Sequence, residues 1–252
     1  TQATTYLLSV VMPVVCWYTG IQPPSFFYYE TMKIFLDTAD TQLIQDGYNT
    51  GLIDGITTNP TLIMKSGRDP EEVYQELIDM GLRDVSMEVV GNRKEMYEEG
   101  VRLSNKFGKY ATIKVPCTPD GLAVCKELSR QLIRVNVTLI FSVTQAILSA
   151  KAGATYVSPF VGRVQDNNFD GVKLVGDIVK TFETHERDTQ ILAASLRSVY
   201  DVSSCFQVGA DIVTMPPKLF WGMYNHILTE KGLQIFNADW AKVKEIIKER
   251  EV

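Results

Sequence analysis

The sequence has few of the residues from which metal, disulfide and dinucleotide sites are built. It contains two histidines, His185 and His226, which lie far apart in the chain. The 4 cysteines show no Cys-x-x-Cys spacing, and none of the 17 glycines belongs to a Gly-x-Gly pair. These absences exclude a three-histidine zinc site and argue against a disulfide framework or a dinucleotide-binding turn. We therefore predict that no metal and no organic cofactor takes part.

The chain also lacks the charge and the long apolar runs that indicate nucleic-acid or membrane partners. Its formal net charge is −5, with no dense run of Lys and Arg. It has no uninterrupted apolar stretch of about twenty residues, the length that spans a bilayer. With 252 residues, 45% hydrophobic and 22% charged, the composition is that of an ordinary globular protein. We expect a cytoplasmic protein with reduced cysteines, and neither a nucleic-acid nor a membrane partner.

The first 31 residues differ from the rest. Residues 1–30 contain no Lys or Arg, and an apolar run from Tyr6 to Tyr18 is broken by Pro13. The run is shorter than a membrane span and lacks the basic start of a signal peptide. Because a strand pattern begins cleanly at Met32, we expect residues 1–31 to be an extension outside the native fold. An interfacial membrane anchor is the alternative.

From residue 32 onward, short β-branched runs alternate with longer amphipathic stretches, and nothing between them resembles a linker. The expected strands cover residues 33–38, 55–59, 84–90, 111–116, 135–141, 155–160, 190–195 and 211–215. The helices that follow them cover 40–48, 70–80, 93–107, 119–132, 143–152, 171–182, 199–208 and 217–228. Eight such units predict an α/β fold, a closed (β/α)8 TIM barrel forming a single domain over 32–252. An open doubly wound sheet is the competing architecture. A ninth helix is expected at 238–250, outside the barrel count.

One strand carries a lysine at its centre, Lys114 in Ala111–Pro116. A buried, unpaired ammonium is costly, so this side chain must reach solvent, find a partner or lose its proton. A neutral amine is the nucleophile that forms a Schiff base with a carbonyl substrate. The alternative is a lysine on an edge strand that points into water.

Strand alternation places further polar residues on the same, inward faces as Lys114. Asp37, Glu88, Asn136 and Thr138 all fall on these faces near strand ends, where the active sites of such barrels lie. Each has a structural alternative: Asp37 as a helix cap, Glu88 as an ion-pair partner, and the other two as groups that satisfy strand ends. Several buried ionisable groups around one centre nevertheless favour a catalytic constellation.

These residues suffice for carbon–carbon bond cleavage through an iminium. Lys114 would attack a ketone, and Asp37 would take the proton from the hydroxyl that becomes an aldehyde. Glu88 and Thr138 could hold the water that is lost and regained. Arg163 and Arg197 follow strand ends and could bind a phosphate, with surface salt bridges as the alternative.

Six ordered motifs carry a resemblance to a known family: Phe-Leu-Asp-Thr at 35–38, Thr-Thr-Asn-Pro at 57–60, Val-Ser-Met-Glu-Val at 85–89, Ile-Lys-Val-Pro at 113–116, Asn-Val-Thr-Leu-Ile-Phe-Ser at 136–142 and Ser-Pro-Phe-Val-Gly-Arg at 158–163. Between Met32 and about Trp240 the sequence resembles the transaldolases, within the short subfamily that also includes fructose-6-phosphate aldolase. The resemblance implies Lys114 as the Schiff-base lysine, Asp37 as acid and base, and Glu88 with Thr138 as the water-holding pair. It implies phosphate binding by Arg163 and Arg197, and substrate binding by Thr57, Asn59, Asn136, Ser158, Phe160 and Ser195.

Two positions bear on which reaction the resemblance implies. The aldolase relatives carry glutamine where this chain has Glu88 and tyrosine where it has Phe160. A phenylalanine cannot protonate an enamine, so the three-carbon unit should wait for an acceptor aldehyde. The expected reaction transfers dihydroxyacetone from fructose 6-phosphate or sedoheptulose 7-phosphate to glyceraldehyde 3-phosphate or erythrose 4-phosphate. An aldolase that releases dihydroxyacetone and a non-catalytic phosphosugar-binding barrel are the alternatives.

The resemblance also concerns assembly. The short relatives form ring-like decamers in which a C-terminal helix contacts a neighbour, so we expect a homo-oligomer. Leu233, Ile235, Phe236 and Trp240 supply suitable apolar contacts, with packing on the same chain as the alternative. Arg134 departs from the relatives' pattern, and the sequence assigns it no function.

Overall fold

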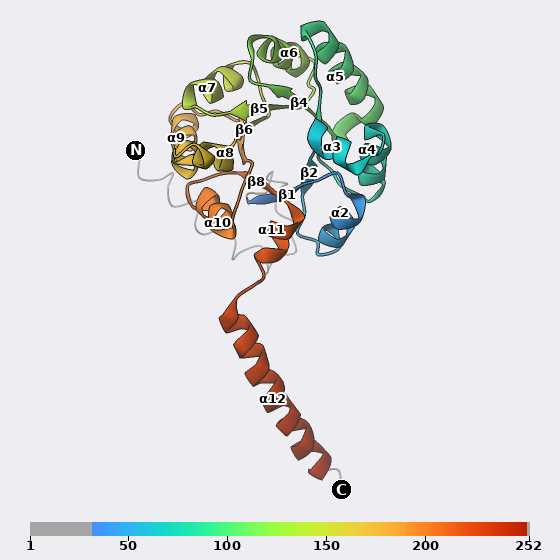
Figure 1. Cartoon of the computed structure of the whole chain (residues 1–252), viewed down its shortest axis with the longest axis vertical. Helices are drawn as coiled ribbons and strands as arrows, with labels where there is room; N and C mark the ends of the chain where they lie inside the picture. The colour runs from blue at the N-terminus through green and yellow to red at the C-terminus, as the bar shows by residue number, and fades with distance from the viewer. Residues whose placement is uncertain (1–31, 251–252) are drawn as a thin grey trace, which may run out of the picture. The chain divides into compact units, whose positions relative to one another are not determined.

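The structure, a computed structural model, describes residues 32–250, and the prediction made for residues 1–31 lies outside this range. Eight parallel strands close into a barrel in sequence order. Figure 1 shows the strands and helices arranged in a ring. The strands are β1 (Lys33–Asp37), β2 (Gly55–Thr57), β3 (Val85–Glu88), β4 (Ala111–Pro116), β5 (Val135–Ile140), β6 (Tyr156–Pro159), β7 (Gln190–Ala193) and β8 (Ile212–Met215). The predicted (β/α)8 barrel is confirmed.

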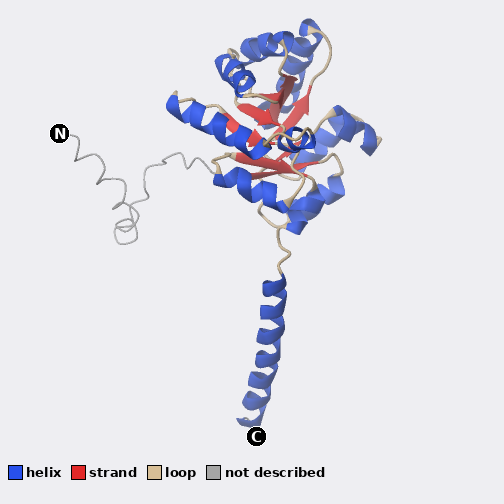
Figure 2. Ribbon diagram, turned by 60° about the vertical axis from the view of Figure 1, so that its left-hand side comes forward, coloured by secondary structure: helices blue, strands red, loops and turns tan. Residues whose placement is uncertain are grey.

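The remaining regular elements are helices, and all but the last of them surround the strands (Figure 2). They are α2 (Thr41–Tyr48), α3 (Pro60–Ser66), α4 (Pro70–Asp79), α5 (Arg93–Phe107), α6 (Pro119–Ser129), α7 (Val143–Lys151), α8 (Val161–Asp166), α9 (Gly171–Thr184), α10 (Val199–Gln207), α11 (Pro217–Gly222) and α12 (Ile227–Arg250), with a short 3-10 turn, η1, at Gly108–Tyr110. None of them is long and apolar enough to cross a membrane.

Three features of the helices differ from the prediction. The short helices α3 and α8 were not predicted, because six or seven residues are too few to establish a helical period. The helix predicted to end at residue 228 stops at Gly222, and the last helix begins at Ile227 rather than at 238. Residues 217–228 are therefore divided between α11 and the start of α12, with residues 223–226 between the two helices.

The two faces of the sheet carry two separate cores. Outward side chains such as Leu36, Met87 and Ile113 are fully buried against the helices and belong to the larger cluster. Inward apolar side chains form a smaller cluster inside the barrel, which includes Phe35 and Leu192. This alternation is what a closed barrel requires, and it leaves only inward positions near the strand ends for a site.

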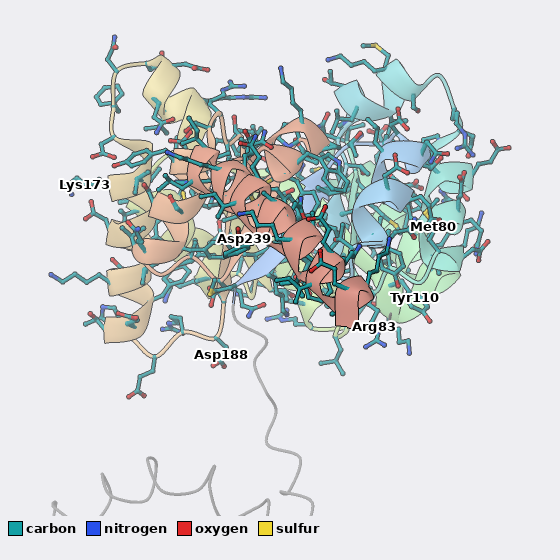
Figure 3. All side chains as sticks on the ribbon, turned by 90° about the horizontal axis from the view of Figure 1, so that it is seen from below. Met80, Arg83, Tyr110, Lys173, Asp188 and Asp239 are labelled. Carbon is teal, nitrogen blue, oxygen red and sulfur yellow. The ribbon has the colours of Figure 1, made fainter. Side chains whose placement is uncertain are left out.

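At the amino end of the barrel interior, polar side chains form a closed network. Asp84 precedes β3 and accepts hydrogen bonds from Thr112 Oγ1 at 2.8 Å, Tyr156 OH at 2.7 Å and Arg134 Nη1 at 2.6 Å. Arg134 also donates to the Lys109 carbonyl at 2.7 Å. Arg134, which the sequence left without a role, therefore pairs with a buried carboxylate. The amino ends of the strands face downward in Figure 3. The residues labelled there that precede strands, Arg83 before β3, Tyr110 before β4 and Asp188 before β7, lie toward the lower side of the molecule.

Candidate active site

A cavity of 640 Å³ lies at the opposite, carboxyl ends of the strands. With one exception, Asn136, every residue predicted for the site lines it. Those residues are Asp37, Thr57, Asn59, Glu88, Lys114, Thr138, Ser158, Phe160, Arg163, Ser195 and Arg197. A cavity of this size suits a small organic ligand.

Lys114 lies in the wall of this cavity and is 5% exposed. The parallel register sets Lys114 on β4 opposite Glu88 on β3, so both side chains point inward at one level. Lys114 Nζ lies 3.0 Å from Glu88 Oε2 and donates to the Thr58 backbone carbonyl at 3.0 Å. The lysine therefore does not reach open solvent, the alternative that the strand alone had left open.

Asp37 ends β1 on the same wall. It accepts a hydrogen bond from Thr57 Oγ1 at 2.8 Å, and the Thr57 hydroxyl lies 2.7 Å from that of Thr214. Burial raises the pKa of the Asp37 carboxyl, against the opposing effects of Lys114, the Thr57 hydrogen bond and Arg163. The helix-capping alternative for Asp37 does not hold, because Asp40 caps α2 through the amides of Gln42 and Leu43.

Thr138 lies on β5 where the pairing with β6 is irregular. The register shifts between Val137 and Ile140, and Leu139 has a φ of 61°, a left-handed conformation that is uncommon outside glycine. Thr138 Oγ1 is buried yet has no hydrogen-bond partner among the described residues. A buried hydroxyl normally has one. This hydroxyl is therefore available to a small polar group in the cavity, whose wall also contains Glu88.

The two asparagines lie at different depths. Asn59 Oδ1 caps α3 by accepting from the Leu62 amide at 3.0 Å, and Asn59 faces the cavity. Asn136 is fully buried beneath the wall, where it accepts from Ser158 Oγ at 2.7 Å and donates to Ser86 Oγ at 3.4 Å. Substrate contact by Asn136 stays a prediction. In this arrangement its amide holds the cavity-lining Ser158.

The cationic rim of the cavity comes from the short helix α8 and from the segment that follows β7. Arg163 on α8 lies over the Phe160 ring, 4.8 Å from its centre, while Arg197 pairs with Asp166 at 2.8 Å. The two segments meet closely at Gly162, where a Cβ would lie 2.0 Å from the Ser195 carbonyl oxygen. A glycine is required for that approach.

The model of the family described as Transaldolase/Fructose-6-phosphate aldolase matches residues 34–251. The chain belongs to this family. A relative named "Probable transaldolase" in Paracoccus denitrificans is 51% identical over 217 residues, which is 86% of this chain and 100% of the relative. Relatives of the same name in Cereibacter sphaeroides and Caulobacter vibrioides are each 48% identical over 217 residues, 86% of this chain and 99% or 100% of their own length. The resemblance inferred from the motifs is thereby confirmed.

Among the residues at this family member's site that sequence reasoning missed are Thr58, Lys65 and Thr214. Thr214 shares the inward face of β8 with Ile212, so the period of two could have found it. Lys65 is an exposed cation that lines the cavity from α3, a helix that was not predicted. Thr58 contacts Lys114 through its backbone carbonyl, and no residue-type pattern reveals a backbone contact.

Proposed function

We propose that this chain is a transaldolase that moves a dihydroxyacetone unit between sugar phosphates through a Schiff base on Lys114. The observation that carries the proposal is the buried contact of Lys114 with Glu88 in a cavity whose wall also contains Asp37. A nucleophilic amine, a separate carboxylate and a second carboxylate beside the amine are the groups that this chemistry needs.

In the first half-reaction, the neutral Lys114 amine attacks the ketone carbon of the donor to give a carbinolamine. Loss of water leaves an iminium, which draws electrons from the adjacent carbon–carbon bond. Glu88 and Thr138 hold and exchange protons with this water. The free buried hydroxyl of Thr138 supports that role.

In bond cleavage, the Asp37 carboxylate takes the proton from the donor's C4 hydroxyl. The C3–C4 bond breaks, C4 becomes the aldehyde of the departing aldose phosphate, and its electron pair forms an enamine on Lys114. The acceptor aldehyde then meets the enamine, Asp37 returns the proton to the new hydroxyl, and water hydrolyses the iminium. Fructose 6-phosphate or sedoheptulose 7-phosphate is the donor, and erythrose 4-phosphate or glyceraldehyde 3-phosphate the acceptor.

The remaining wall residues bind the sugar. Thr57, Asn59, Asn136, Ser158, Phe160 and Ser195 form the proposed substrate-binding set. Arg163 and Arg197 bind the phosphate, because guanidinium groups suit its paired oxygens. Arg163 makes no ion pair within residues 32–250, which supports its availability to an anion. Phe160 supplies no hydroxyl to protonate the enamine, so the dihydroxyacetone unit stays on Lys114 until an acceptor arrives.

The test incubates the full chain with fructose 6-phosphate, alone and with erythrose 4-phosphate, and reduces parallel samples with borohydride. We expect mass spectrometry to find an adduct on Lys114, and sedoheptulose 7-phosphate only when the acceptor is present. Lys114→Met should give no adduct, whereas Lys94→Met, which changes an exposed lysine on α5, should trap normally. Free dihydroxyacetone without acceptor would identify an aldolase instead. Absence of any adduct would leave a phosphosugar-binding barrel.

We propose further that the enzyme works in the cytoplasm as a ring-like homo-oligomer, with a decamer as the specific assembly. Free thiols at Cys117, Cys125 and Cys205 support a reducing compartment. Apolar side chains exposed along α12, such as Phe236 and Trp240, support an interface between copies. Sedimentation equilibrium would measure the assembly directly, and a species of 28.3 kDa would contradict it.

A further inference from the structure

Thr58 is the second partner of the Lys114 amine, and the reaction described above gives it no role. Its carbonyl oxygen accepts from Lys114 Nζ at 3.0 Å, the same distance that separates Nζ from Glu88 Oε2. A neutral amine has two N–H donors and one lone pair. With one donor on Glu88 and the other on Thr58, the lone pair is left to face the cavity that Lys114 lines.

The direction of that lone pair depends on how firmly the Thr58 carbonyl is held. Thr58 lies just after β2, which ends at Thr57. Two hydrogen bonds to one acceptor extend the strand pairing by a residue: the Thr58 amide donates to the Ser86 carbonyl at 3.2 Å, and Thr58 Oγ1 donates to the same oxygen at 2.8 Å. Thr58 and Ser86 are both fully buried. The hydroxyl therefore adds to a backbone contact that would otherwise be a single long bond.

A tyrosine from outside the barrel completes this arrangement. Tyr74 lies on α4 (Figure 1), a helix that packs against β3. Its hydroxyl lies 3.4 Å from Thr58 Oγ1. Because Thr58 Oγ1 donates its only proton to Ser86, Tyr74 is the donor in this contact. The Tyr74 ring is 4% exposed and packs edge-on against Phe107, with ring centres 6.0 Å apart. The Thr58 hydroxyl therefore contacts two buried groups, the Ser86 carbonyl and the Tyr74 hydroxyl.

We propose that Thr58 is a positioning residue whose carbonyl aims the Lys114 lone pair at the substrate ketone, and that Tyr74 holds Thr58 in place. The proposal rests on the proposed function, because it assumes that Lys114 is the nucleophile. Thr58 does not line the cavity, so in this proposal it acts through Lys114 rather than on the substrate. A displacement of a reacting group by about 1 Å can cost on the order of a hundredfold in rate, so loss of this support should appear in the rate and not in substrate binding.

The test compares Thr58→Val, which keeps the shape but loses the hydroxyl, with Thr58→Ser, which keeps the hydroxyl. We expect Thr58→Val to lower kcat and the single-turnover rate of borohydride trapping on Lys114 by roughly 10- to 100-fold, with KM for fructose 6-phosphate within about twofold. Thr58→Ser should restore most of both rates. Tyr74→Phe, which removes only the donor to Thr58, should lower them by a smaller factor, roughly three- to tenfold.

The matched control is Tyr156→Phe, which removes a buried tyrosine hydroxyl at the other end of the barrel and should leave both rates unchanged. Equal trapping rates in Thr58→Val and Thr58→Ser would overturn the proposal. Should Thr58→Val fail to fold, Tyr74→Phe decides, and wild-type rates in that variant would likewise overturn it. An absence of trapping in the wild-type chain would instead refute the proposed function, so the two failures are distinguishable.

Discussion

The barrel interior carries ionisable groups at both ends, and the two ends satisfy them differently. At the amino end, Asp84 accepts three side-chain hydrogen bonds, and its cationic partner Arg134 also binds a backbone carbonyl. At the carboxyl end, the Lys114–Glu88 pair lies in the wall of a 640 Å³ cavity, close to a buried threonine hydroxyl that has no partner within residues 32–250. Both ends use the same chemical groups, but only one leaves some of them available to a ligand.

The difference teaches how one fold separates stability from chemistry. A buried charge is tolerated where every group around it is paired, as at Asp84. Groups left under-satisfied in a cavity cost stability, and they persist where a substrate will complete them. Changes at the carboxyl end should therefore alter rates more than stability. Changes at the amino end should do the opposite.

The largest effect is expected from Asp37→Asn at the carboxyl end. Asp37 is the acid and base of the proposed mechanism, so its loss should lower kcat by about 10³-fold, within the range typical of such groups. The amide keeps the shape of Asp37 and can still accept from the Thr57 hydroxyl. Steady-state assay with fructose 6-phosphate and erythrose 4-phosphate measures the loss.

The same variant should gain stability, with a pH dependence whose sign follows from burial. Burial raises the pKa of Asp37 above its ordinary 3.8, so the folded state binds its proton more tightly than the unfolded state does. The contribution of Asp37 to the free energy of unfolding is therefore fully present below about pH 3.8. It falls as the pH rises through the pKa that Asp37 has in the folded state. Asparagine carries no charge, so the variant does not incur the cost of burying an ionised carboxylate. Asp37→Asn should melt above wild type at pH 7 by a margin that shrinks toward pH 4, and a constant margin would contradict the assignment.

Much of this contrast could be predicted from sequence, and the limits have physical causes. The alternation of strands with helices predicted the barrel. The period of two in side-chain direction along a strand placed Lys114 and Glu88 on inward faces. Alternation does not give depth, so Asn136 was expected on the cavity wall although it lies beneath it. The role of Arg134 depends on the distant Asp84, and that of Thr58 on a backbone oxygen, neither of which a local pattern contains.

At the amino end, Asp84→Ala should lower stability and leave catalysis intact. The change removes the acceptor of three donors, two of them the buried hydroxyls of Thr112 and Tyr156. We expect a loss of about 3 kcal/mol in unfolding free energy, which lowers the melting temperature by roughly 6–12 °C. This figure allows little for the lost ion pair, because the Arg134 side chain is 30% exposed and water can solvate it. Asp46→Ala, an exposed carboxylate on α2, is the matched control and should change stability by less than about 0.5 kcal/mol. A tenfold fall in kcat for Asp84→Ala would show that the two ends are coupled.

The smallest effect is expected from Tyr156→Phe, which tests whether the Asp84 network depends on any single donor. Burial, followed by the neighbouring Asp84 carboxylate, raises the pKa of the Tyr156 phenol, so at neutral pH this hydroxyl keeps its proton and donates. Phenylalanine removes that bond but keeps the ring, whose edge-on contact with Phe35 has its centres 6.4 Å apart. Asp84 then retains two donors, so the expected cost is only about 1 kcal/mol, or roughly 2–4 °C in melting temperature by calorimetry. A loss as large as that of Asp84→Ala would mean that the Asp84 network fails as a whole when one donor is removed. The amino end would then be as sensitive to the loss of one group as the cavity is, and the separation of stability from chemistry would not hold.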